Sequence, residues 1–225
     1  MGEKMSKIII VGTFNLEISE EVDKIYAHVK SHTNCEIDFI YTEEETSYCQ
    51  KIDGKYMIFL RKDTENTNDV LAHELLHILQ SEDGMTISEI PEDISEENLD
   101  LIASLKNIIL DYDVNQELIN TYKYDVTPDH TQFNTWLPLI KQKKNPNIEI
   151  SQYDTKRFAV NFFGVMVLDS KNNCEKLLRY ADQYTLEIRK IVYHLNDCIK
   201  LYDVGNRVDS CKTIYEECAK VLGIL

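Results

Sequence analysis

Residues 70–81 have the sequence Val70-Leu71-Ala72-His73-Glu74-Leu75-Leu76-His77-Ile78-Leu79-Gln80-Ser81. Apolar side chains recur at positions 70, 71, 75, 78 and 79, and this spacing predicts an amphipathic α-helix. Asn68 or Asp69, just before it, can cap the helix by accepting a hydrogen bond from its first turn.

Upstream of this helix, short β-branched or alternating segments predict strands over 7–12, 36–41 and 56–60. Apolar residues at helical spacing predict a helix over 17–31. The pair Asp53-Gly54 predicts a tight turn leading into the last of these strands. The region is therefore expected to be α/β in character.

Downstream, the sequence becomes helical. Helices are predicted over 96–122, 153–168, 171–203 and 207–222, a loop over 125–136, and a linker over 141–147. If it is unbroken, the helix over 171–203 is long enough to span about 50 Å. The predicted fold class is α+β, with a small mixed sheet and its site-bearing helices followed by an all-helical C-terminal region. We expect one domain over 1–145 and a helical region over 146–225 packing on it.

The composition and charge of the chain argue against several classes of function. The chain has 225 residues, 43% of them hydrophobic, and a net charge of −15, which argues against binding to a nucleic-acid backbone. No window reaches the roughly 18 apolar residues of a membrane-spanning helix, and the N-terminus lacks the apolar stretch of a secretory signal. The six cysteines include no Cys-x-x-Cys pair, so we expect reduced thiols in a cytoplasmic protein.

The acidic residues are concentrated around the helix over 70–81. Between Lys62 and Lys106 there is no lysine or arginine, while aspartates and glutamates are frequent. Such a surface keeps a protein soluble. It can equally form a negative rim that favours metal ions and basic substrate segments.

His73 and His77 are four residues apart, so on a helix their imidazoles lie one above the other. That spacing suits two zinc–nitrogen bonds of about 2.0–2.1 Å. Glu74 projects beside the pair, where it can take a proton from a zinc-activated water and pass it to a leaving amine. The pattern predicts a Zn2+ site with Glu74 as the catalytic base. His28 and His32 have the same spacing without the glutamate and are predicted to lie on the surface.

Zinc needs a third protein ligand if it is to keep one open coordination position. On the helix over 96–122, Asp111 and Asn115 share a face that apolar neighbours direct inward. Asp113 and Glu117 form a second pair about 160° away, so only one pair can face a metal. We predict Asp111 as the third ligand, with Asn115 hydrogen-bonding a ligand histidine or the helix backbone. Asp113 and Glu117 remain alternatives for the third ligand.

Hydrolysis would also need a group that stabilises the oxyanion. His130, in the loop just past the predicted ligand helix, is the main candidate, and Tyr41, Tyr122 and Tyr124 are alternatives. His130 is equally explained as a turn residue that forms local hydrogen bonds.

The segment from His73 to His77, followed by a helix with Asp111 and Asn115, resembles the gluzincin-like arrangement of zincin metallopeptidases. The stretch over 107–118 is similar to the second motif of VWA-associated bacterial metallopeptidases, although Asp111 stands where many relatives have glutamate. The resemblance covers residues 55–120. It implies a zincin domain, Asp111 as a zinc ligand, and a peptide or protein substrate.

Three functions compete. The first is a zinc-dependent metallopeptidase that hydrolyses a peptide bond through a water activated by Glu74. The alternative is a catalytically silent, zincin-like metal-binding protein with an interaction or regulatory role. The intact Glu74 favours hydrolysis, because a structural zinc would not require a base there. A helical interaction protein with a chance motif predicts no stoichiometric metal. The sequence leaves the substrate and the oligomeric state open.

Overall fold

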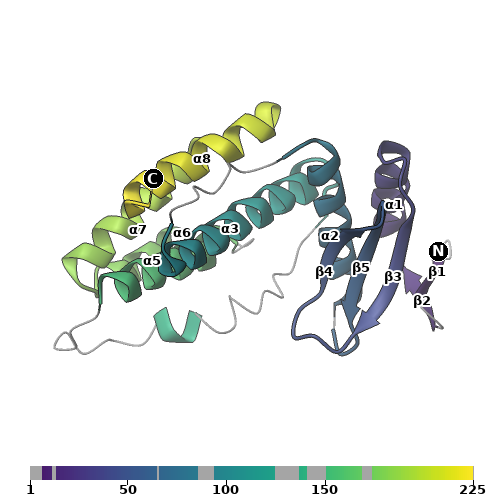
Figure 1. The fold of residues 1–225 in the computed structure, drawn as a ribbon, viewed down its shortest axis with the longest axis horizontal. Helices are drawn as coiled ribbons and strands as arrows, with labels where there is room; N and C mark the ends of the chain where they lie inside the picture. The colour runs from purple at the N-terminus through teal and green to yellow at the C-terminus, as the bar shows by residue number, and fades with distance from the viewer. Residues whose placement is uncertain are drawn as a thin grey trace. The chain divides into compact units, whose positions relative to one another are not determined.

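The computed structural model describes residues 7–11, 14–64, 66–85, 94–124, 137–140, 151–168 and 174–224. The chain is α+β, with a small mixed sheet and an all-helical C-terminal region, so the predicted fold class is confirmed (Figure 1). It divides into two compact units, one of Met1–Met85 with Gln116–Thr127 and one of Thr86–Asn115 with Pro128–Leu225. This division does not coincide with the boundary expected at residue 145, because residues 96–115 group with the later helices.

The described residues of the first unit form two sheets. Strand β1 (Lys7–Val11) pairs antiparallel with β2 (Phe14–Ile18). The second sheet has the order β3-β5-β4, formed by β3 (Ile37–Thr42), β4 (Tyr48–Ile52) and β5 (Lys55–Arg61). Strand β5 runs parallel to β3 and antiparallel to β4. The sheet is therefore mixed, with β4 at its edge.

Two strands were missed by the sequence patterns. The helix predicted from residue 17 begins later, because Ile18 ends β2 and Ser19 caps α1 (Glu20–His32) by accepting a hydrogen bond from the Val22 amide at 3.2 Å. Strand β4 lies at the edge of the sheet with only half-buried or exposed side chains, so it carries no apolar run. The turn predicted at Asp53-Gly54 is confirmed, since φ is 49° and 79° at these residues, as a tight β4–β5 hairpin requires.

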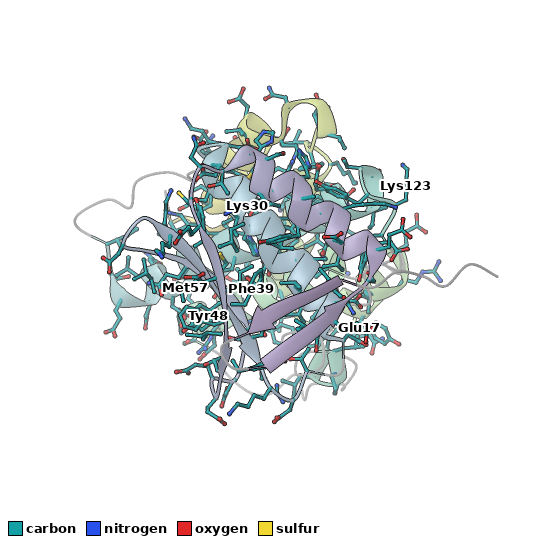
Figure 2. All side chains as sticks on the ribbon, turned by 90° about the vertical axis from the view of Figure 1, so that its right-hand side faces the viewer. Glu17, Lys30, Phe39, Tyr48, Met57 and Lys123 are labelled. Carbon is teal, nitrogen blue, oxygen red and sulfur yellow. The ribbon has the colours of Figure 1, made fainter. Side chains whose placement is uncertain are left out.

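One face of the three-stranded sheet is covered by helices. Alternate residues of β3 and β5 are buried, namely Ile37, Phe39, Tyr56, Ile58 and Leu60. Figure 2 labels Phe39, whose ring lies 5.8 Å from that of Tyr26 on α1. The Tyr56 hydroxyl donates to Glu82 Oε1 at 2.6 Å and so fixes the C-terminal end of α2 (Thr67–Glu82) against the sheet.

Helix α2 begins one turn earlier than the sequence predicted. Its N-cap residue is Asn66, which makes no capping hydrogen bond through its side chain. The two predicted caps have other partners: Asn68 Oδ1 accepts from the Ser19 amide at 3.0 Å, and Asp69 Oδ1 accepts from the Tyr124 hydroxyl at 2.7 Å. The capping prediction was wrong because long-range contacts within the first unit engage both side chains.

The second unit is helical. It contains α3 (Glu96–Asn120) up to Asn115, α5 (Gln152–Val167), α6 (Cys174–Ala181), α7 (Leu186–Ile199), the short 3-10 helix η1 (Val204–Asn206) and α8 (Arg207–Leu222) (Figure 1). Its core includes Phe158, Phe162, Ile188 and Val192. The helix predicted over 171–203 is broken, because Thr185 caps α7 by accepting from the Ile188 amide at 3.4 Å. No helix among the described residues is long and apolar enough to cross a membrane.

Candidate metal centre

Helix α2 is buried along most of its surface. Its buried apolar residues are Leu71, Ala72, Leu75, Leu76, Ile78 and Leu79. His73 and His77 are half-buried and share the remaining face. The apolar positions therefore fix the helix in the first unit, and the two imidazoles project from a rigid element.

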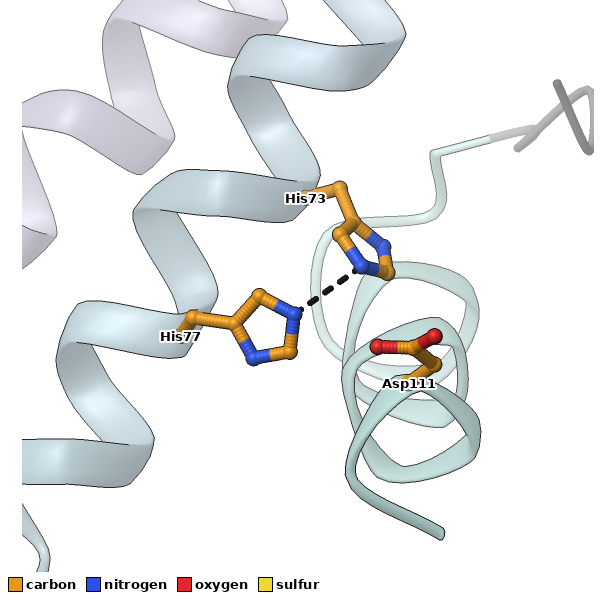
Figure 3. A group of neighbouring side chains, drawn as sticks. All are labelled: His73, His77 and Asp111. Carbon is orange, nitrogen blue, oxygen red and sulfur yellow. Dashed lines mark hydrogen bonds between the residues drawn. The ribbon is translucent and has the colours of Figure 1, made fainter. Parts of the chain in front are cut away.

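The two imidazoles face each other through the atoms that a metal would use. Nε2 of His73 lies 3.0 Å from Nε2 of His77, and the ring centroids are 4.7 Å apart (Figure 3). Two bonds of about 2.0–2.1 Å at a tetrahedral metal put the nitrogens about 3.3 Å apart. The pair is within a few tenths of an ångström of that separation, so the fit requires little movement of either ring.

Asp111 completes a group of three donors. One ligand atom from each of His73, His77 and Asp111 lies within 4.8 Å of the others, and all three side chains are half-buried (Figure 3). Asp111 is on α3, five residues before Gln116, where the part of this helix that groups with the first unit begins. The structure thus brings together the three residues that the sequence predicted as ligands. Two imidazoles and a carboxylate are a donor set that could hold a metal ion.

Glu74 is 7% exposed and lies near the edge strand β4. Cys49 of β4 is paired in register with the buried Ile58, so its thiol faces the helix-covered side of the sheet. Burial, and secondarily the negative charge of Glu74, raise the pKa of Cys49 to about 12. The thiol is therefore neutral at ordinary pH.

The alternative ligand Asp113 has other partners. Its side chain is completely buried and accepts hydrogen bonds from Arg207 Nε at 2.9 Å, Arg207 Nη2 at 2.6 Å and the Tyr202 hydroxyl at 2.6 Å. These contacts account for the buried charge without a metal. Glu117 is also buried, at 8% exposed. Asp113 is therefore buried through contacts with the start of α8 and with Tyr202, and not through a metal site.

Asn115 lies one turn after Asp111 and is 3% exposed. Its Oδ1 is buried and accepts no hydrogen bond from the described residues. The hydrogen bond that the sequence predicted for Asn115 is therefore not formed through this oxygen. A buried acceptor without a donor is unfavourable by about 1–3 kcal/mol.

Two of the candidate oxyanion stabilisers are engaged elsewhere. The Tyr124 hydroxyl donates to Asp69, and burial together with that carboxylate raises the pKa of Tyr124. The Tyr122 hydroxyl is hydrogen-bonded to His28 Nδ1. His130 lies outside the described residues. His28 and His32 are exposed, as predicted, with their rings 5.1 Å apart.

Gln80 and Cys49 were not singled out from the sequence. Gln80 is 3% exposed, and its Oε1 lies 2.7 Å from Nδ1 of His77. A polar residue three positions after a candidate ligand histidine, directly following Ile78 and Leu79, was the available signal. Cys49 offered no comparable signal, because its strand was not predicted.

No model of a known protein family, no curated protein and no solved structure matches the chain. The resemblance to zincin metallopeptidases therefore stays a prediction that rests on residues 55–120. The geometry around His73, His77 and Asp111 is independent of that resemblance.

Proposed function

We propose that the chain is a zinc-dependent metallopeptidase in which His73, His77 and Asp111 hold the metal. The observation that carries the proposal is the convergence of these three side chains, with the two Nε2 atoms 3.0 Å apart. Two nitrogen donors and one oxygen donor are typical of catalytic zinc sites, which keep a fourth position open for water or substrate. When bound, zinc would act as a Lewis acid and lower the pKa of a coordinated water to about 7.

Glu74 is the proposed general base. It follows His73 directly on α2, and only 7% of its surface is exposed. The helix itself therefore holds it close to the imidazole pair. Its carboxylate accepts the proton of the attacking water and then delivers it to the nitrogen of the leaving amine. A purely structural zinc site would need no carboxylate at this position, and this distinguishes hydrolysis from simple metal binding.

The proposal is tested with a mixture of fluorescence-quenched peptides of random sequence and with zinc measured on the same samples. The wild type should cleave peptides, lose activity to a chelator and regain it with zinc. Glu74→Gln should retain zinc and lose hydrolysis by about 10²–10⁴-fold. Glu82→Gln is the matched control on the same helix, because Glu82 binds Tyr56 and Lys51. It should retain both properties.

The competing function predicts a different result. Zinc-loaded wild type that cleaves the mixture no faster than Glu74→Gln would reject hydrolysis and leave a metal-binding interaction or regulatory protein. A chain that takes up no zinc would reject both functions.

A further inference from the structure

Gln80 has an unusual place for an amide. It is on α2 three residues after His77, it is 3% exposed, and it directly follows the buried Ile78 and Leu79. A buried amide is unfavourable unless it is hydrogen-bonded. Here the Oε1 atom lies 2.7 Å from Nδ1 of His77, a normal hydrogen-bond distance.

This contact has a direction that determines the tautomer of the imidazole. An amide oxygen accepts hydrogen bonds and does not donate them, so Nδ1 of His77 must carry the hydrogen. The lone pair of the neutral ring is then on Nε2. That atom is the one that faces Nε2 of His73 at 3.0 Å.

A histidine binds a metal through a deprotonated nitrogen, and its other nitrogen is commonly held by an acceptor that fixes the ring. His77 and Gln80 are both on α2, so the helix sets their spacing. The acceptor is therefore already in place before a metal binds.

We propose that Gln80 is the positioning residue of His77: it holds the ring in the Nδ1–H tautomer and turns Nε2 toward the metal. This inference rests on the proposed metal centre and adds a residue that acts through His77 without touching the metal. It predicts that removing the acceptor weakens metal binding even though all three ligands remain.

The test compares Gln80→Met, which keeps the length and helix propensity of the side chain but loses the acceptor, with Gln80→Glu, which keeps an acceptor. Zinc affinity is measured by competition with a chromophoric chelator. Gln80→Met should bind zinc about 10–100-fold more weakly, and Gln80→Glu should bind at least as tightly as the wild type. The tautomer of His77 is measured by nitrogen-15 NMR on the metal-free protein, where the wild type should show Nδ1–H and Gln80→Met should lose that preference.

A matched control separates positioning from packing. Asn161 is also a buried amide, at 7% exposed, and its Nδ2 donates to the Arg157 carbonyl on its own helix at 2.8 Å. Asn161→Leu should alter stability while leaving zinc affinity and the His77 tautomer unchanged. A purely structural role for Gln80 would give the same pattern in Gln80→Met.

The experiment separates failure of this inference about Gln80 from failure of the proposed function. If the wild type binds zinc and Gln80→Met binds within threefold of it with an unchanged tautomer, the inference is overturned and the metal centre stands. If the wild type binds no zinc, the proposed function fails, and an Nδ1–H tautomer lost in Gln80→Met still supports the contact itself. If Gln80→Met does not fold, a tenfold loss of affinity in Gln80→Glu overturns the inference.

Discussion

Asp111 and Asp113 are two carboxylates on one helix, and the structure gives them different surroundings. Asp111 lies with His73 and His77, whereas Asp113 is completely buried against Arg207 and Tyr202. We therefore expect Asp111→Asn to affect metal binding and Asp113→Asn to affect stability. The two substitutions are chemically identical and two residues apart, so each serves as the control for the other.

The magnitudes follow from the contacts. Asp113→Asn leaves the Arg207 guanidinium, with a side chain 17% exposed, without its carboxylate partner. Breaking a buried ion pair by removing one partner costs about 3–5 kcal/mol. Asp111→Asn changes a half-buried group, and we expect a change of less than about 1 kcal/mol in the metal-free protein. Its zinc affinity should fall more than about 100-fold, because loss of groups behind the ligands alone weakens metal sites by 10–100-fold.

The assay is urea unfolding followed by circular dichroism in the presence of a chelator, together with zinc affinity by chelator competition. Tyr202→Phe gives an intermediate point, since it removes one hydrogen bond to a charged group and should cost about 1.5–3 kcal/mol. The reasoning is refuted if Asp113→Asn lowers zinc affinity as much as Asp111→Asn while both retain wild-type stability.

Three further predictions concern other parts of the chain. Alkylation of Cys49 at pH 8 should be about a thousandfold slower in the folded, metal-free protein than in urea. The reason is that a pKa of about 12 leaves on the order of one thiolate in 10,000. The substitution Glu74→Gln should accelerate this alkylation, because it removes a negative charge near the thiol. Because the pKa of Cys49 is raised on folding, its neutral thiol contributes to the free energy of unfolding below about pH 9. This contribution is lost as the pH rises toward 12. Asn115→Leu should leave the unfolding free energy of the metal-free protein unchanged or raise it by about 1 kcal/mol, since it removes a buried acceptor without a partner; a loss above about 2 kcal/mol would contradict this. Gly54→Ala should cost about 1 kcal/mol in urea unfolding because φ is +79° there, with Gly54→Asn less affected; equal costs would argue against a conformational origin.

The parts of the fold that were predictable carry strong local patterns. The α2 motif, the apolar strand β5 and the Asp53-Gly54 turn are each set by residues within one element. The missed strand β4 has no such pattern, because its pairing with β5 is a tertiary interaction and its side chains are half-buried or exposed. The break before α7 was missed because a single capping residue, Thr185, ends a continuous helical periodicity.

The candidate metal site, too, was predictable from local patterns but not from contacts between distant residues. The spacing of His73 and His77 follows from helix geometry, and Asp111 was preferred over Asp113 by the face that it shares with apolar residues. The sequence could not show that Arg207 and Tyr202, about ninety positions further along the chain, would partner Asp113. It also could not show that Gln80 would be buried against His77 and not exposed to solvent.

The central claim is tested most directly by the zinc content of the purified protein after dialysis against a zinc buffer. The proposed metal centre predicts about one zinc ion per wild-type chain, and its loss from both His73→Ala and Asp111→Ala. Less than about half an equivalent in folded wild type, or a full equivalent retained in His73→Ala, would contradict the proposed metal centre.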